Sequence, residues 1–326
     1  MAIYTIIKLQ HLTPLHLGTG KENYDFSADD LQSDTISAAL SAIRAQIGKT
    51  ADIESFMNSF TISSAFPYID NHYFLPKMQG KINVLVEGSK DDENRKELKK
   101  IKYIELPLWQ HLITGEKVIV NRKQLQQKYM LSGTTQFETK PVSSQVVQRV
   151  SIPRGDGLDA EPFYFNWTYF SEQGGLYFLV DAPAETIKEI LQLFIILGET
   201  GIGSDKNVGG GMFDVVTETI EIKHVSKPNA NMILSLYIPT KDEMKIIKLQ
   251  DSRYQLLHRG GFMAGSQEED FRHLRKKSIF MLGVGSVFPT TEPLKGKVVN
   301  LTPDWNDKRM HPVFRSGKPF YLPVTI

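Results

Sequence analysis

Glycine residues gather in one short segment of the sequence, GETGIGSDKNVGGGMF. Glycine has no side chain and readily adopts positive φ, so consecutive backbone N–H groups can approach and bind an anion. Lys206 adds one positive charge in the middle of the segment. The segment predicts either a plain connection or a loop that cups a sugar-phosphate backbone through Gly201, Gly203, Lys206, Gly209 and Gly210.

Two common nucleotide-binding motifs are excluded for this segment. Rossmann and P-loop turns follow a strand and precede a helix, so that the helix N-terminus meets the phosphate. Here the apolar pattern predicts a helix before the glycines and a strand after them. Gly201-Ile202-Gly203 is also followed by Ser204-Asp205-Lys206, where GxGxxG needs a third glycine.

The residues that usually carry catalysis form no recognisable pattern. The chain has no cysteine, which excludes thiol nucleophiles, cysteine-bound zinc and iron–sulfur clusters. None of its eight histidines pairs as HxH or HxxxH, and GxSxG is absent. We therefore expect no enzymatic activity, no metal and no cofactor. His16, which follows the first predicted strand, is a candidate structural or RNA-contacting histidine.

Residues 117–154 form a basic segment with seven Lys or Arg side chains and one acid, Glu138. The segment also holds six glutamines and has little apolar periodicity, so we expect an insertion outside the core whose removal leaves the protein folded. It is either a solvated loop or an arm along a phosphate backbone. By contrast, residues 90–100 carry five bases and four acids, which predicts a solvent-facing helix or loop without function.

The global composition sets limits on the class of protein. The 326 residues suggest two domains, and a formal net charge of +1 argues against a basic protein that coats nucleic acid. The first 18 residues lack a charged n-region and a long apolar core, so we expect no signal peptide. No apolar stretch is long enough to span a bilayer, and we expect a cytoplasmic protein.

The order of predicted elements indicates an α+β fold. Residues 3–9 read as a strand, and a helix should follow, capped by Ser33, Asp34 or Thr35 and closed by Gly48. A strand near 68–75, then LYFLVD, a helix after Pro183 and the strand 212–217 complete β-α-β-β-α-β, the ferredoxin-like order. Pro228 and Asn229 mark a boundary between domains 1–225 and 226–326, and the second domain is richer in short strands.

Several segments resemble a known family. GETGIGSDKNVGGGMF is similar to the signature loop of the repeat-associated mysterious proteins, the RAMP superfamily of CRISPR systems. LHLGTG with SDTISAAL resembles the first strand–loop–helix of the fourth Csm subunit of type III-A effectors. KKSIFMLGVGSVF and HPVFRSGKPFYLPV resemble the second-domain strands of the same family, so the resemblance covers the whole chain.

The resemblance implies two ferredoxin-like (RRM-like) domains and a non-catalytic subunit that holds the 5′ tag of the crRNA. Its partners would be the crRNA, the large polymerase-cyclase subunit and a backbone subunit. The segment 117–154 would be a thumb, with Tyr129, Met130 and Leu131 wedged between bases. The expected RNA-binding residues are His16, Ser33, Arg122, Lys123, Lys128, Tyr129, Met130, Lys140, Arg149, Arg154, Gly201, Gly203, Lys206, Gly209 and Gly210.

Two alternatives remain open at this point. A related RAMP class cleaves precursor RNA, so the chain could be an endoribonuclease with His16 as general base. It could also belong to the related Cmr-type complex, which would change its partners but not its chemistry.

Overall fold

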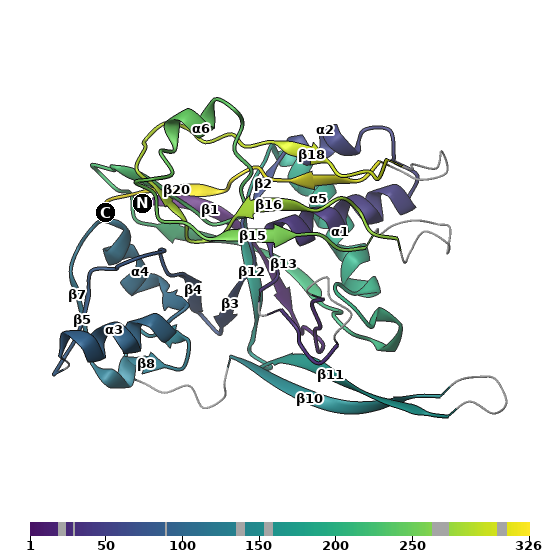
Figure 1. The fold of residues 1–326 in the computed structure, drawn as a ribbon, viewed down its shortest axis with the longest axis horizontal. Coiled ribbons are helices and arrows are strands. Elements are labelled where there is room, and N and C mark those ends of the chain that lie inside the picture. Colours follow the sequence, from purple (N-terminus) through teal and green to yellow (C-terminus); the bar gives the residue numbers. More distant parts are fainter. Residues whose placement is uncertain are drawn as a thin grey trace.

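The computed structural model describes residues 1–18, 24–28, 30–88, 90–134, 141–152, 159–262, 274–304 and 312–326. An antiparallel sheet in the order β13-β1-β12-β3 forms its centre, and two helices connect the strands (Figure 1). The elements are β1 (Ala2–Gln10), α1 (Ser33–Gln46), β3 (Phe66–Ile69), β12 (Gly174–Asp181), α5 (Ala184–Thr200) and β13 (Asp214–Ile222). These strands and helices follow one another in the predicted order, and the α+β class is confirmed.

The two faces of this sheet have different cores. Strand side chains alternate between faces, so that Ile7 and Phe178 point toward α1 and α5, where they pack with Leu40 and Phe194. Ile6 and its neighbours on the opposite face pack against a long insertion and against residues 226–326, which we call the C-terminal half.

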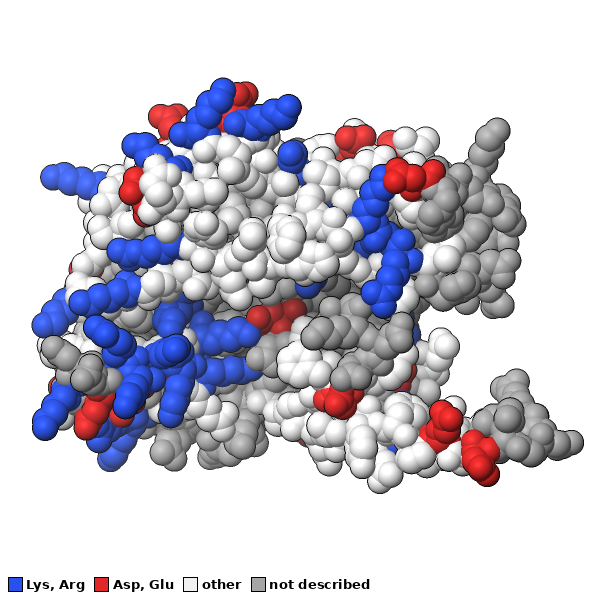
Figure 2. Space-filling view, viewed as in Figure 1, with Lys and Arg blue, Asp and Glu red and all other residues white. Residues whose placement is uncertain are grey.

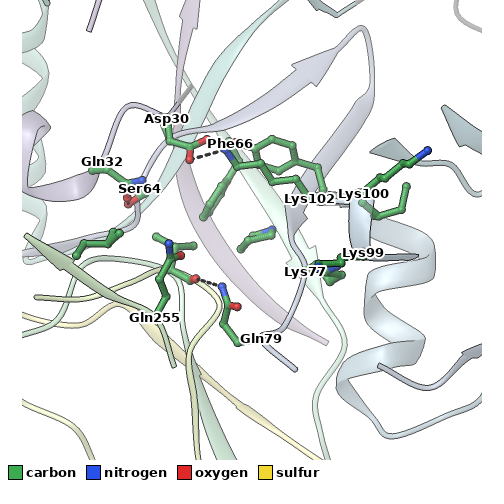
Figure 3. Close-up of a pocket in the computed structure, with 16 residues that line it drawn as sticks. Asp30, Gln32, Ser64, Phe66, Lys77, Gln79, Lys99, Lys100, Lys102 and Gln255 are labelled. Atoms are coloured by element: carbon green, nitrogen blue, oxygen red, sulfur yellow. Dashed lines mark hydrogen bonds and ion pairs between the residues drawn. The ribbon is translucent and has the colours of Figure 1, made fainter. Parts of the chain in front are cut away.

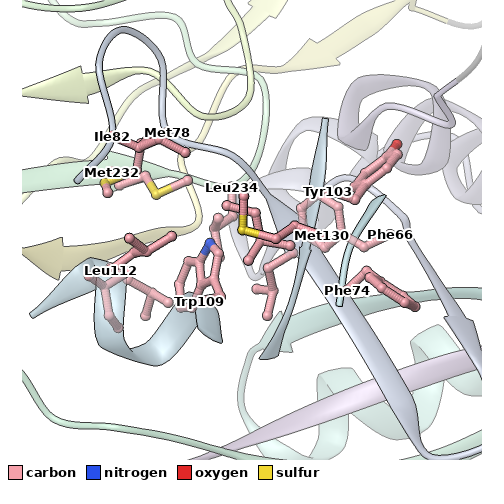
Figure 4. Packing of buried hydrophobic residues seen from close by; sticks show 14 of the residues in the cluster. Phe66, Phe74, Met78, Ile82, Tyr103, Trp109, Leu112, Met130, Met232 and Leu234 are labelled. Atoms are coloured by element: carbon pink, nitrogen blue, oxygen red, sulfur yellow. The ribbon is translucent and has the colours of Figure 1, made fainter. Parts of the chain in front are cut away.

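The insertion extends the sheet at its β3 edge and forms a lobe of residues 77–134, which we call the α3 lobe. The sheet continues through β4 (His72–Pro76), β6 (Tyr103–Glu105), β9 (Tyr129–Met130) and β8 (Leu125–Gln126), while β2 (Thr61–Ile62) pairs with β12. The lobe also holds β5 (Val84–Val86) parallel to β7 (Val118–Val120), α3 (Asp91–Lys100), α4 (Leu106–Ile113) and the 3-10 turn η1 (Arg122–Gln124). Trp109 of α4 is 1% exposed and packs beside Met232 and Leu234 of the C-terminal half (Figure 4).

The α3 lobe corrects the expectation that residues 117–154 lie outside the core. Tyr129, Met130 and Leu131 are at most 3% exposed and belong to the same core cluster as Trp109. They cannot wedge between RNA bases in this structure, and a deletion of 122–149 would remove core side chains. The segment that projects is a hairpin of β10 (Val142–Ser151) and β11 (Glu161–Phe170), and the basic segment supplies its first strand (Figure 1).

The C-terminal half, residues 226–326, consists of short strands and, among its described residues, one short helix. They are β14 (Ala230–Ile233), β15 (Leu256–Arg259), β16 (Ile279–Leu282), β17 (Val287–Phe288), β18 (Val298–Asn300), β19 (Phe314–Ser316), β20 (Tyr321–Val324) and α6 (Glu243–Ile246). The remaining elements are α2 (Ile53–Asn58), on which β18 and β19 pack, and η2 (Lys206–Val208). No helix in the described ranges combines the length and the apolar composition needed to cross a membrane.

The start of α1 connects the two halves of the chain. Asp34 is completely buried, and Arg259 donates to both of its carboxylate oxygens at 2.9 and 3.0 Å. Arg315, itself buried, lies with Nη1 2.7 Å from Asp34 Oδ2. Burial opposes ionisation of Asp34, but the two guanidinium groups outweigh it and hold the pKa of this carboxyl below its usual value.

The neighbouring residue Ser33 also faces the C-terminal half. Its hydroxyl accepts a hydrogen bond from the Leu236 N–H at 2.8 Å, and the side chain is buried. The N-cap is Gln32, which makes no side-chain capping bond. The expectation that Ser33, Asp34 or Thr35 caps the helix is therefore wrong, because the first two side chains are used to join the halves and Thr35 also bonds to Arg259. Burial equally removes Ser33 from the predicted RNA contacts.

We predict that Asp34→Ala lowers the free energy of unfolding by about 3–5 kcal/mol, because it leaves Arg315 buried without its counter-charge. The control is Glu185→Ala, which removes the exposed Lys188–Glu185 pair and should cost at most about 1 kcal/mol. Urea unfolding at neutral pH measures both. Equal costs for the two variants would show that the buried cluster does not join the halves.

The depressed pKa of Asp34 gives the same contribution a pH dependence. A carboxyl with a lowered folded pKa stabilises the protein fully above its unfolded pKa, about 3.9, and this contribution is lost as the pH falls through the folded pKa. The difference in unfolding free energy between wild type and Asp34→Ala should therefore shrink only in strongly acidic solution.

Candidate nucleic-acid interface

A groove of about 410 Å³ lies where the first half, the glycine-rich segment and the C-terminal half meet. We call it the glycine-loop groove. Its lining comes from the segment after β1, the start of α1, the loop between α5 and β13, and the end of β15, namely His16, Leu17, Gly18, Tyr24, Ala28, Asp30, Thr35, Gly203, Ser204, Asp205, Arg259, Gly261 and Phe262. Segments separated by more than 200 residues thus share one surface.

The glycine loop, residues 201–211, forms one wall by lying against the segment after β1. The Ser204 N–H donates to the His16 carbonyl at 3.0 Å, and the Gly211 N–H donates to the Pro14 carbonyl at 3.0 Å. The Thr13 hydroxyl donates to the Gly209 carbonyl at 2.8 Å. These hydrogen bonds attach the loop to the segment after β1. They also occupy some of its backbone N–H and C=O groups, which then do not face a ligand.

Close backbone contacts explain why several positions in this loop are glycine. A Cβ at Gly203 would lie 2.4 Å from the His16 carbonyl oxygen, and one at Gly211 would lie 1.9 Å from the Ile202 carbonyl oxygen. At Gly210 a Cβ would meet the Trp167 ring at 2.9 Å. Gly209 has a positive φ of 82°, similar to the 91° of Gly203, but no atom lies within 4 Å of the place where its Cβ would be. A side chain at Gly203 or Gly210 would therefore disturb the packing of the loop.

His16 is almost fully buried, although it lines the groove. Its Nδ1–H donates to the Asn166 carbonyl at 2.8 Å, and its ring lies 4.4 Å from the ring of Phe165. Both partners belong to β11, so this histidine joins the middle of that strand to the segment after β1. The contacts give His16 a structural role and leave little of it for a ligand.

Arg149 also joins the hairpin to the glycine loop. Its guanidinium pairs with the Asp205 carboxylate and lies 4.6 Å from the centre of the Phe165 ring and 5.4 Å from that of Trp167. The ion pair and the two cation–π contacts fix the position of this guanidinium within the protein. Arg149 is therefore a positioning residue for the hairpin in this structure, whereas the sequence predicted a phosphate contact.

Of the other predicted basic residues, the four that the structure describes do not line the groove. Arg122 pairs with Glu93 and Glu97 on the surface of α3, and Lys128 lies near the Tyr103 ring. Lys123 is exposed on η1, and Lys206 is exposed at the start of η2. Lys140 and Arg154 lie outside the described residues.

Sequence reasoning missed the side chains best placed to bind a ligand in the groove. Arg259 contributes positive charge, and its side chain is 25% exposed. Tyr24 and Phe262 are 52% and 42% exposed and supply aromatic surface. They come from segments without a motif, and only the tertiary fold brings them to the glycine loop.

Positive side chains outnumber negative ones around Asp34. Arg259, Arg315 and Lys276 surround the single carboxylate of Asp34, and burial together with the two guanidinium groups lowers the pKa of Lys276 to about 8. Three cations beside Asp34 leave positive charge at this end of the groove, where the two lining acids, Asp30 and Asp205, are paired with Lys102 and Arg149. Exposed aromatic rings next to positive charge are typical of surfaces that bind single-stranded nucleic acid.

Comparison with known proteins shows which family the chain resembles. Residues 226–324 match the model of the CRISPR Csm4 C-terminal domain. A CRISPR system Cms protein Csm4 of Thermococcus onnurineus is 28% identical over 264 residues, which cover 78% of this chain and 82% of that protein. The chain is a Csm4-like RAMP protein. A second Csm4, from Methanocaldococcus jannaschii, is 22% identical, with 83% of this chain and 84% of that protein covered.

The Csm4-like chain shares its fold, along its whole length, with chains of two solved complexes. A chain in the crystal structure of a Csm1–Csm4 cassette superimposes with a TM-score of 0.63 at 20% identity, covering 100% of this chain and 99% of that one. A chain of a Csm3–Csm4 subcomplex from a type III-A CRISPR-Cas interference complex gives 0.62 at 18% identity, covering 99% and 100%.

We predict that Gly203→Ala destabilises the Csm4-like protein by about 1–3 kcal/mol more than Gly209→Ala. Both glycines have positive φ, 91° and 82°, so the backbone penalty is shared, and only Gly203 has a carbonyl oxygen where the Cβ must go. Thermal unfolding of the two variants measures the difference. Equal melting temperatures would show that the loop does not rest tightly on the segment after β1.

Proposed function

We propose that the Csm4-like chain is a non-catalytic crRNA-binding subunit of a type III-A CRISPR (Csm) effector complex that serves antiviral defence. It would hold the 5′ tag of the crRNA and bridge the large polymerase-cyclase subunit to a backbone subunit. The names of its relatives support the assignment, since similar proteins occur in a Csm1–Csm4 cassette and in a Csm3–Csm4 subcomplex.

The glycine-loop groove is the observation that carries the RNA-binding part of the proposal. It combines a guanidinium, Arg259, with two exposed aromatic rings, Tyr24 and Phe262. Single-stranded RNA offers a phosphate for the first and unstacked bases for the others. Phosphate contacts fix the position of a strand without reading its sequence, whereas stacking accepts any base.

The projecting hairpin takes the place of the thumb in this proposal. The β10–β11 hairpin is anchored beside the groove by His16 and Arg149, and its far face carries the exposed side chains Val146, Val150 and Tyr164. The first half, with the order β1-α1-β3-β12-α5-β13, is inferred to be a ferredoxin-like domain. For the second half the same topology stays a prediction, because its described residues contain one helix of four residues.

We predict that Tyr24→Ala and Phe262→Ala each weaken binding of single-stranded RNA by about 1–3 kcal/mol, which is roughly 5- to 150-fold, because each removes a stacking surface. Ile195→Ala is the control, since Ile195 is 56% exposed on α5 and does not line the groove. Fluorescence anisotropy with a labelled crRNA tag measures the affinities, and melting temperatures exclude unfolding. Unchanged affinity in both groove variants would contradict the proposed site.

We predict that the purified protein leaves repeat RNA intact in the absence of metal, because the imidazole of His16 is buried and its Nδ1–H is bound to Asn166. Denaturing gels after prolonged incubation provide the measurement. Specific cleavage that is lost in His16→Ala and kept in His11→Ala, an exposed histidine, would instead establish the endoribonuclease alternative.

A further inference from the structure

A second cavity, of about 470 Å³, opens between the α3 lobe and the C-terminal half (Figure 3). Four lysines line it, and we call it the lysine pocket: Lys77 follows β4, Lys99 and Lys100 end α3, and Lys102 precedes β6. Figure 2 shows Lys and Arg side chains gathered over this lobe, beside the hollow that separates it from the C-terminal half.

The lysines outnumber the acids of the pocket. Among the described lining residues Asp30 is the one carboxylate, and it pairs with Lys102 at 2.7 Å. Lys77 donates to the Leu98 carbonyl at 2.6 Å, and burial lowers its pKa. Lys99 and Lys100 are exposed. The pocket therefore carries positive charge in excess, which favours an anionic ligand.

The helix dipole alone does not explain this cluster. Lysines at the end of a helix are favourable because of the partial negative charge there, and this accounts for Lys99 and Lys100. It does not account for Lys77 and Lys102, which reach the same cavity from outside the helix. Convergence of these segments on one cavity indicates a binding site.

Amide side chains complete the chemistry of the pocket. Gln32, Gln79 and Gln255 line it from three separate segments (Figure 3). Gln79 Nε2 donates to the Val284 carbonyl at 3.3 Å, and Gln32 Oε1 accepts from the Ser64 hydroxyl at 2.8 Å. Carboxamides donate and accept hydrogen bonds, as the edges of nucleobases do. Lysines for phosphate and amides for a base together fit a nucleotide.

The lysine pocket adjoins the glycine-loop groove. Asp30 lines both cavities, so they meet at this residue, where Lys102 and the Tyr103 hydroxyl bind its carboxylate. A strand that occupied both cavities would pass Asp30, the residue that they share. This continuity favours a nucleotide of a longer strand over a free nucleotide.

We propose that the lysine pocket binds a nucleotide of the same single-stranded RNA that occupies the glycine-loop groove, with its phosphate on Lys99 and Lys100 and its base at the glutamines. The proposal rests on the proposed RNA-binding function. It extends the RNA surface from the first half onto the α3 lobe, where neither the glycine loop nor the hairpin reaches.

The test is the double variant Lys99→Glu/Lys100→Glu, with Arg95→Glu/Lys96→Glu as the matched control. Both pairs are exposed on α3 and change the net charge equally, but only the first lines the pocket. Binding of single-stranded RNA is measured over a range of salt concentrations. For each phosphate that the variant no longer binds, the slope of log K against log salt concentration should fall by about 0.7.

A series of RNA lengths provides a second, independent readout. For wild type and control, affinity should rise when the RNA becomes long enough to extend past the groove, and the pocket variant should lack this increase. If the pocket variant and the control behave alike while Tyr24→Ala still weakens binding, the pocket inference is overturned and the proposed function stands. If neither Tyr24→Ala nor the pocket variant affects binding, the RNA-binding function itself fails.

AMP added to the protein distinguishes a strand from a free nucleotide. We expect AMP to bind far more weakly than the increase in affinity with longer RNA would suggest, and long RNA to displace it. Tight AMP binding that long RNA does not displace would overturn the proposal in favour of a free-nucleotide site.

Discussion

The ion pairs of the buried Asp34 carboxylate are the interaction on which the arrangement of the two halves depends. It lies in the first turn of α1 and binds two arginines of the C-terminal half, Arg259 and Arg315. Both cavities described above have walls from the two halves, so their shape requires the halves to stay in register. Removing one partner of a buried ion pair leaves the other charge uncompensated, so an arrangement that separates Asp34 from the arginines is costly.

The same cluster also shapes the chemistry of the groove. Arg259 uses its Nε and Nη2 on Asp34 and Thr35, which fixes the guanidinium in place while 25% of the side chain stays exposed. A preoriented cation loses less conformational entropy on binding than a free surface lysine. The residue that joins the halves therefore also presents positive charge to the groove.

The sequence predicted local elements well, because periodicity and punctuation are local properties. The strand at 3–9, the helix closed by Gly48 and the strand–helix–loop–strand around the glycines all appear. It failed where long-range contacts decide. Tyr129 and Met130 form a two-residue strand whose burial depends on β6 and α4, and no pattern over such a length distinguishes it from a loop. Asp34 stands just before the apolar pattern of α1, where a capping residue is expected, but its partners Arg259 and Arg315 lie more than 200 residues away in the sequence.

The candidate site shows the same division. The glycine loop was recognised from composition, yet the positions of its glycines reflect contacts with the protein's own backbone at His16 and Ile202. Such contacts make the loop a wall of the groove, and the side chains proposed to bind the ligand, Tyr24, Arg259 and Phe262, lie around it. The two adjoining cavities then differ in what they offer a strand, since the groove is rich in aromatic surface and the lysine pocket in charge. Stacking is little affected by salt, whereas phosphate contacts weaken with it. A strand bound along both would therefore remain anchored in the groove while its end in the lysine pocket exchanges more readily as ionic strength rises.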